Sequence, residues 1–232
     1  MPPTLAGQRS EPIHLNPAAE LAERVLLPGD PQRALAMAQA LLDAPKMFNT
    51  RRGLWGYTGA APDGKAVTIQ ATGMGGPSAA IVVEELIDLG ARRLVRTGTC
   101  GALDPELELG QLVTAAEVVG MDGTSRALGA GDRLTPDASL TEALKEAGGG
   151  PAVTVASTDL FYGPPPTTRA SVVEMEAAAL LAVAARRDVA AACVLLVSDL
   201  LIGDERRRLT QGELEAGGVR LGEVALRALA AN

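Results

Sequence analysis

The stretch AAACVLLVSD, residues 190–199, is a run of eight apolar residues that ends directly in a serine and an aspartate. A continuous apolar run of this length predicts a β-strand that is buried on both faces. Residues 93–97, RLVRT, form a second, nearly continuous run of the same kind. Such strands belong to mixed or parallel sheets with helices on each side, where ligands bind beyond the carboxyl ends of the strands. The residues that contact a ligand should therefore follow the strands directly.

Strands and helices alternate along most of the chain around these two runs. Strands are predicted at 24–27, 54–58, 66–71, 93–97, 112–119, 152–156 and 190–197, and helices at 31–42, 77–89, 140–146, 175–187 and 212–230. This order predicts an α/β fold with a central mixed or parallel sheet covered on both faces. We expect one domain at 14–232, preceded by a flexible tail at 1–13.

The composition limits the classes of function. The chain has 232 residues, 47% of them hydrophobic, which is enough for one full core, and an aromatic content of 2% means that Ala, Val and Leu must fill it. A formal net charge of −7 is the opposite of what a non-specific nucleic-acid binder needs. Any phosphate that the protein binds should therefore be small and held by a few local groups.

The cysteines and the apolar segments favour a cytoplasmic protein. Cys100 and Cys193 are far apart and are interpreted as free, buried thiols. The first 13 residues lack the basic and apolar regions of a secretory signal. Residues 180–202, the most apolar stretch, contain four charged residues. We therefore expect no membrane span and a cytoplasmic localisation.

The segment VLLPGDPQRA, residues 25–34, has the form of a strand followed by a helix start that can bind an anion. Asp30 can cap the helix, Pro31 suits its first turn, and free backbone N–H groups there favour an anion. Arg33 lies at the unfavourable end of the helix dipole unless an anion is nearby. An ordinary solvated arginine is the alternative.

The segment LVRTGTCGALD, residues 94–104, places Arg96 inside an apolar strand and Thr99 in a glycine-bounded turn after it. A buried arginine requires a partner, which is either a bound anion or an internal Glu or Asp. The segment lacks the full GxGxxG spacing, and Asp104-Pro105 follows where a helix should begin. Dinucleotide binding is therefore rejected.

Two further segments combine a helix start with groups that could contact a ligand. ATGMGGPSAAIVVEEL, residues 71–86, has glycines that permit close approach of a ligand, but no GxxxxGK[ST] motif occurs in the sequence. VVEMEAAAL, residues 172–180, carries Glu174 and Glu176 at the start of an Ala/Leu-rich helix. These carboxylates could accept hydrogen bonds from sugar hydroxyls, or they could simply stabilise the first turn.

The end of the strand at 190–197 supplies a candidate general acid. Asp199 follows Ser198 at its carboxyl end, where an acid is well placed for proton transfer, and a helix or turn cap is the alternative. Other chemistry is limited by composition. His14 is the one histidine, so a Ser-His-Asp triad would need it to fold back into the core, and no cluster has the spacing of a metal site.

The motifs PGDPQR, RTGTCGA, STDLFY and VEMEA, in this order, resemble the hexameric class of nucleoside phosphorylases, the family of bacterial purine nucleoside phosphorylase and uridine phosphorylase. The resemblance extends from about His14 to the C-terminus. It implies a single-domain αβα sandwich with a central mixed sheet, usually assembled as a hexamer, a trimer of dimers. It also implies a pentosyltransferase of nucleoside catabolism and purine salvage, which splits purine nucleosides reversibly into free base and (deoxy)ribose 1-phosphate.

The same resemblance implies a role for thirteen residues. They are Gly29, Arg33, Arg52, Arg96 and Thr99 for phosphate; His14, Met74, Met175 and Glu176 for ribose; Phe161, Glu174 and Ser198 for the base; and Asp199 as the acid that protonates the purine N7. In this family the residues matching Arg52 and His14 come from a neighbouring subunit. Bound phosphate then gives Arg96 the anion that its burial requires, in place of an internal acid.

The mechanism implied by the resemblance needs inorganic phosphate as co-substrate and no metal or organic cofactor. Phosphate, held by three guanidinium groups, attacks C1′ while Asp199 neutralises the charge that accumulates on the leaving base. Two departures from the family pattern affect the base site. The segment at 163–172 is short, and Arg206, Arg207 and Arg208 are only approximate matches to an arginine that assists the acid.

Three other functions fit parts of the sequence. Uridine phosphorylase shares the fold, and Thr99 and MDGTS suit it, but GPPPTTR lacks the glutamine of its uracil clamp. A methylthioadenosine-type nucleosidase uses water and has no need of three phosphate arginines. In a non-enzymatic binding or storage protein, Asp199 would have no function.

Overall fold

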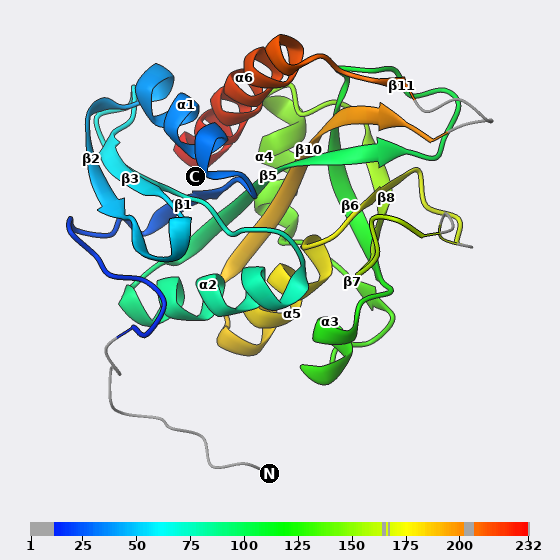
Figure 1. Cartoon of the computed structure of the whole chain (residues 1–232), viewed down its shortest axis with the longest axis horizontal. Coiled ribbons are helices and arrows are strands. Elements are labelled where there is room, and N and C mark those ends of the chain that lie inside the picture. Colours follow the sequence, from blue (N-terminus) through cyan, green and yellow to red (C-terminus); the bar gives the residue numbers. More distant parts are fainter. Residues whose placement is uncertain (1–11, 164–165, 167, 202–206, 232) are drawn as a thin grey trace.

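The computed structural model describes residues 12–163, 166, 168–201 and 207–231, which form an 11-stranded mixed sheet with helices on both faces (Figure 1). The strands are β1 (Arg24–Leu27), β2 (Asp43–Asn49), β3 (Gly56–Ala60), β4 (Ala66–Gln70), β5 (Arg93–Ala102), β6 (Leu112–Gly120), β7 (Arg133–Leu134), β8 (Ala152–Ser157), β9 (Val172–Glu174), β10 (Ala190–Leu200) and β11 (Arg207–Arg208). Their order in space is β11-β10-β6-β8-β9-β5-β1-β4-β3-β2, with β7 beside β6.

The two long apolar strands organise this sheet. β5 and β10 pair in parallel along their whole length, from Arg93 opposite Ala190 to Ala102 opposite Leu200. Because β5 also pairs with β9, and β10 with β6, the strands β5, β9, β8, β6 and β10 close into a ring. Both central strands are therefore paired on both sides, and most of their residues are buried.

The helices cover the sheet in two layers (Figure 1). Helices α1 (Pro31–Leu41), α4 (Ala138–Glu146) and α6 (Gln211–Ala230) pack on one face, and α2 (Gly76–Leu89), α3 (Gly123–Ala127) and α5 (Ala177–Arg187) on the other. A short 3-10 helix, η1 (Arg51–Gly53), follows β2. None of the helices described here has the length and apolar character needed to cross a bilayer.

The structure confirms the predicted α/β fold and contains each predicted strand and helix. One prediction about local structure is wrong. β5 continues to Ala102, so Thr99 lies in a strand paired with β10 and not in a turn. Ile13, predicted to be in the flexible tail, is hydrogen-bonded through its N–H to Glu85 and through its carbonyl to Arg51. The rest of the predicted tail, apart from Pro12, lies outside the described residues.

Strand pairing brings several strand ends to one edge of the sheet. β1, β4, β5 and β10 run parallel, with Leu27 of β1 opposite Arg96 of β5. The chain continues from β1 into Gly29, whose carbonyl accepts a hydrogen bond from Gly73 N at 3.0 Å, just beyond β4. Asp199 lies opposite Gly101, on the far side of β5 from β1. The predicted site residues after four strands are therefore neighbours.

Candidate functional site

Arg96 on β5 is the centre of a buried ion network. Its Nε donates to Glu174 Oε2 at 2.8 Å and its Nη2 to Glu176 Oε2 at 2.5 Å. Burial opposes the charge of the guanidinium, but the two carboxylates raise the pKa of Arg96 above its usual value. The expectation that a bound anion supplies the counter-charge in place of an internal acid is therefore wrong, because internal acids are present.

One nitrogen of the Arg96 guanidinium nevertheless lacks a hydrogen-bond acceptor among the described residues. Its Nη1 is buried and makes no hydrogen bond within the part of the chain that the structure describes. The guanidinium reaches this position by passing over Gly98, where an added Cβ would lie 2.7 Å from Arg96 Cζ. A buried N–H donor without an acceptor is costly, so the structure retains capacity for one more acceptor here.

Arg33 in the first turn of α1 supplies a second cation with unused donors. The side chain is half-buried and makes no hydrogen bond or ion pair to any described residue. Burial and the charge of Arg96 lower the pKa of the Arg33 guanidinium, against the opposing effects of Asp30 and Glu176. The protein environment therefore disfavours the charge of Arg33, and a small anion beside both arginines would reverse that balance.

Two neutral donors lie at the same edge of the sheet. The Gly29 N–H has no acceptor among the described residues, and neither has the half-buried hydroxyl of Thr99. The N–H of Arg33 is not available, because Asp30 Oδ1 caps it at 2.8 Å. The Arg33 guanidinium, Nη1 of Arg96, the Gly29 N–H and the Thr99 hydroxyl thus have no internal acceptors in the described ranges, and together they are a suitable set of donors for a tetrahedral oxyanion.

Gly218 in α6 gives Arg33 its space, and sequence reasoning missed it. An added Cβ at Gly218 would lie 3.1 Å from Arg33 Cγ and 3.2 Å from Cδ. Gly217 in turn packs on Leu196, where an added Cβ would lie 2.6 Å from Cδ2. Each glycine inside a helix destabilises it by about 1 kcal/mol relative to alanine. Two adjacent glycines within a predicted helix could therefore have indicated a packing or functional role.

The two glutamates of VEMEA lie at the junction of β9 and α5. The Glu174 carboxylate accepts from Ser157 Oγ at 2.6 Å and from the N–H groups of Glu176 and Ala177, besides Arg96. Glu174 thus supports the network, and its contact with a base stays a prediction. Glu176 Oε1 accepts from Gly75 N at 2.5 Å, which joins α5 to the glycine cluster before α2. Burial raises the pKa of the Glu176 carboxyl, and Arg96 opposes the rise.

Asp199 is buried at the end of β10 beside a cationic partner. Its Oδ1 lies 2.7 Å from Arg208 Nε, and its Oδ2 accepts from Ser198 Oγ at 2.8 Å. Strand β11 produces the first contact, because Arg208 is paired in register with Asp199. Of the three candidate arginines, Arg208 therefore contacts the acid, whereas Arg206 lies outside the described residues.

The remaining apolar candidates are exposed or half-buried. Met74 is 88% exposed in the loop before α2, and Met175 is half-buried between Glu174 and Glu176. Phe161 is 47% exposed and makes an edge-on contact with Tyr162, with 5.0 Å between the ring centres. Exposed side chains of this kind can contact the apolar face of a ligand.

His14 and Arg52 are not brought to the Arg96 network of their own chain. His14 Nδ1 contacts Glu85 at 2.7 Å, ten residues along α2 from Gly75. At 1.5 Å per helical residue, that separation is roughly 15 Å. Arg52 is exposed, has a left-handed backbone with φ of 59°, and makes no hydrogen bond within the described residues. It follows Arg51, whose Nη1 donates to the Ile13 carbonyl at 3.0 Å.

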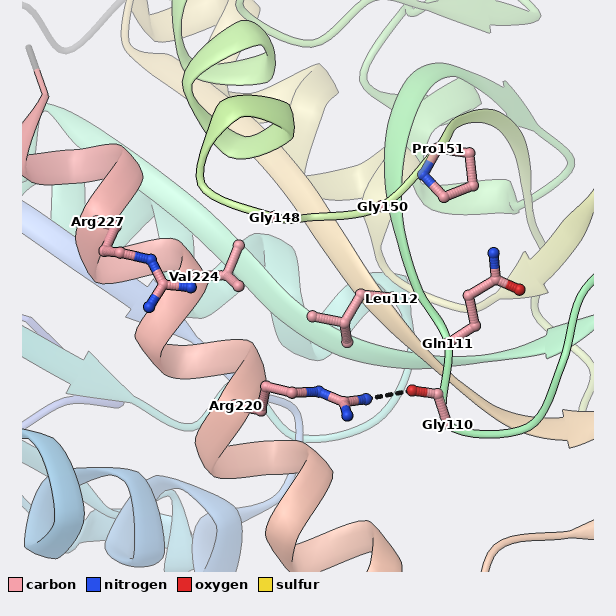
Figure 2. Close-up of a pocket in the computed structure, with 9 residues that line it drawn as sticks. All are labelled: Gly110, Gln111, Leu112, Gly148, Gly150, Pro151, Arg220, Val224 and Arg227. Carbon is pink, nitrogen blue, oxygen red and sulfur yellow. Dashed lines mark hydrogen bonds between the residues drawn. The ribbon is translucent and has the colours of Figure 1, made fainter.

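No group of three or more His, Cys, Asp or Glu side chains suitable for a metal ion occurs in the described ranges. A separate pocket of about 370 Å³ lies between α6 and the loops before β6 and β8 (Figure 2). Its two arginines donate to backbone carbonyls, Arg220 to Gly110 and Arg227 to Ala147. None of the predicted site residues lines this pocket.

Comparison with known proteins identifies the family of the chain. The family model described as the Phosphorylase superfamily matches residues 23–231. The chain belongs to this superfamily. The match includes the strand ends that carry Gly29, Arg96, Glu174 and Asp199.

Individual members of the phosphorylase superfamily resemble the chain over parts of its length. A DeoD-type purine nucleoside phosphorylase of Caldanaerobacter subterraneus subsp. tengcongensis is 48% identical over 97 residues, which are 41% of each chain. The enzyme of the same description from Clostridium beijerinckii is 37% identical over 161 residues, 65% of this chain and 67% of that one. The chain thus matches about two fifths of the length of the first of these relatives.

Solved structures of the phosphorylase superfamily share the fold over nearly the whole chain. A purine nucleoside phosphorylase from Toxoplasma gondii superposes with a TM-score of 0.82, covering 91% of this chain and 92% of that one at 24% identity. A uridine phosphorylase from Vibrio fischeri superposes with a TM-score of 0.81, covering 92% and 93% at 24% identity. At this identity the likeness establishes the fold.

The different environments of the two arginines predict different effects on stability. Arg96→Met leaves Glu174 and Glu176 buried without their counter-charge, so the free energy of unfolding should fall by about 3–5 kcal/mol. Arg33→Met keeps the buried aliphatic stem and removes a charge that burial disfavours, so it should change stability by less than about 1 kcal/mol. Urea unfolding in buffer free of phosphate and sulfate measures both. An equal loss in the two variants would show that Arg33 also has a structural counter-ion.

Proposed function

We propose that this protein is a purine nucleoside phosphorylase, which uses inorganic phosphate to split purine nucleosides reversibly into free base and (deoxy)ribose 1-phosphate. The observation that carries the proposal is the pair of arginines with unused donors, Arg33 and Arg96, at the strand edge that also holds the buried acid Asp199. The names of the curated relatives support the purine class of substrate.

Phosphate binding is assigned to Arg33, to Arg96 through its free Nη1, to the Gly29 N–H and to the Thr99 hydroxyl. The cations hold the nucleophile in a fixed orientation toward C1′, which lowers the entropic cost of the reaction. They also favour an anionic phosphate in a site with little water. Phosphate then forms a bond to C1′ as the bond from C1′ to the base breaks. The reaction as proposed needs no metal or organic cofactor.

Ribose is assigned to Met74, Met175 and Glu176, which lie between the phosphate donors and the start of α2. Both Glu176 oxygens already accept one hydrogen bond, from Gly75 N and Arg96 Nη2. Each carboxylate oxygen has a second lone pair, so Glu176 can still accept from the 2′ and 3′ hydroxyls.

The base is assigned to the side of the site formed by Phe161, Ser198 and Asp199. Asp199 is the acid that protonates N7 of the departing purine. Its carboxylate contacts Arg208 through Oδ1 and Ser198 through Oδ2. The Arg208 side chain is 54% exposed, so it can move away from Asp199 when a nucleoside binds and leave the carboxyl oxygen to the base.

His14 and Arg52 are proposed to complete the site of a neighbouring subunit in a homo-oligomer, a hexamer built as a trimer of dimers. Two observations support an intersubunit role. His14 is held too far along α2 to reach the Arg96 network of its own chain. Arg52 projects from the adjacent segment, is exposed, and has no partner among the described residues.

The proposed function is tested by product formation from inosine, adenosine, guanosine and uridine, each with and without inorganic phosphate. We expect release of base only with phosphate, and faster turnover of a purine nucleoside than of uridine. Equal release without phosphate would identify a hydrolase. Faster turnover of uridine would contradict the assignment of a purine substrate while leaving the phosphorylase chemistry in place.

Asp199→Asn tests the assignment of the acid. The asparagine keeps the size and a hydrogen-bond donor but has no proton to transfer, so kcat on adenosine should fall by about 10²–10⁴. The loss on inosine should be smaller, because an amide can donate to O6 of the departing base. KM should change little, since the interaction strengthens as the bond breaks. Wild-type kcat on both substrates would rule out Asp199 as the acid.

Mixed oligomers of Arg52→Ala and Asp199→Asn test whether two subunits share one site. Each variant alone should be nearly inactive in phosphorolysis. Subunits co-expressed in equal amounts should regain about a quarter of the wild-type sites, because each mixed pair contains one site with both changes and one with neither. No recovery in oligomers shown by mass spectrometry to be mixed would place Arg52 in the site of its own chain.

A further inference from the structure

Glu85 on α2 holds the segment that carries His14 with an unusual number of hydrogen bonds. Its Oε1 accepts from Ile13 N at 3.1 Å and from His14 N at 2.9 Å, and its Oε2 accepts from Leu15 N at 2.7 Å. Three consecutive backbone N–H groups therefore converge on one carboxylate. Arg51 Nη1 binds the Ile13 carbonyl of the same segment at 3.0 Å.

The same carboxylate also contacts the imidazole ring. His14 Nδ1 lies 2.7 Å from Glu85 Oε1, and the two side chains are 29% and 13% exposed. Burial opposes the charge of Glu85, but the N–H groups of Leu15 and His14 and the His14 ring lower the pKa of the carboxyl below its usual value. An ionised carboxylate can only accept, so Nδ1 must be the nitrogen that carries the proton.

This contact determines what the rest of the ring offers. With the proton of the neutral ring on Nδ1, Nε2 has a free lone pair and is a hydrogen-bond acceptor. Nothing in the described part of the chain contacts Nε2, and the ring is partly exposed. Without Glu85, the ring could rotate or carry its proton on Nε2, and three backbone N–H groups of residues 13–15 would lose their acceptor.

We propose that Glu85 is a positioning residue for recognition of the ribose 5′ hydroxyl: it anchors residues 13–15 and keeps the His14 proton on Nδ1, so that Nε2 accepts a hydrogen bond from that hydroxyl in the neighbouring subunit's site. This inference rests on the proposed function. Glu85 itself does not touch the substrate. Its effect should therefore appear only with nucleosides that have a 5′ hydroxyl.

The chain offers a matched control one residue away. Glu84 lies on the same helix and pairs with Arg187, and it does not contact residues 13–15. Glu84→Gln thus removes a comparable ion pair between α2 and α5, whereas Glu85→Gln disturbs the anchor of His14. In Glu85→Gln an amide NH₂ replaces one of the accepting oxygens, so the segment and the ring lose part of their acceptors.

The test compares kcat/KM for inosine and 5′-deoxyinosine, and for uridine and 5′-deoxyuridine, in wild type, Glu84→Gln, Glu85→Gln and His14→Ala. We expect Glu85→Gln to lower kcat/KM for the 5′-hydroxy substrate by about tenfold, because one hydrogen bond is lost. The kcat/KM for the 5′-deoxy substrate should change by less than about twofold. Glu84→Gln should keep the wild-type ratio of the two. Adding Glu85→Gln to His14→Ala should cause no further loss, because the two residues act as one unit.

Different failures of this test are distinguishable. If Glu85→Gln lowers kcat/KM for both substrates of a pair by the same factor, or for neither, Glu85 has a purely structural role. The inference is then overturned while the proposed function stands. If wild type releases no base from either nucleoside in a phosphate-dependent way, the proposed function fails and the inference fails with it.

Discussion

The buried contact of Arg96 with Glu174 and Glu176 is the interaction on which the rest of the site depends. It joins the central strand β5 to β9 and to the start of α5, and Glu176 extends the link to Gly75 before α2. A single guanidinium thus fixes the relative positions of three chain segments that are far apart in the sequence. Gly98 is part of the same constraint, since any side chain there would collide with Arg96.

The network leaves N–H donors without acceptors among the described residues at one edge of the sheet. Arg96 has one buried nitrogen without an acceptor, and Arg33 lies nearby, with its aliphatic stem packed against Gly218. Burial and the charge of Arg96 disfavour the charge of Arg33 when no anion is bound, against the opposing effects of Asp30 and Glu176. We interpret that cost as the source of anion affinity, because the same charges stabilise a bound phosphate and the charge that develops during bond cleavage.

Local patterns in the sequence were sufficient to predict seven of the eleven described strands, five of the six described α-helices and the need of Arg96 for a partner, but not β2, β7, β9, β11 or α3. The identity of the partner was not predictable, because β9 is only three residues long and reaches β5 by a non-local antiparallel pairing. The closure of the ring had no local signal either, since it depends on β5 continuing through two glycines to Ala102. Arg208 follows from the register of β11, and Glu85 from a contact 71 residues away in sequence. Long-range pairing, in contrast to local propensity, determines these features.

The central claim is that Arg33 and the free nitrogen of Arg96 form one phosphate site, and calorimetric titration of inorganic phosphate at constant ionic strength tests it most directly. The account predicts that wild-type protein binds one phosphate per chain without nucleoside. It also predicts that Gly218→Ala, which crowds the Arg33 stem without removing a charge, binds phosphate more weakly, and that Arg33→Met does not bind it measurably. Binding of equal strength in wild type and Arg33→Met, or no binding by wild type, would contradict the account.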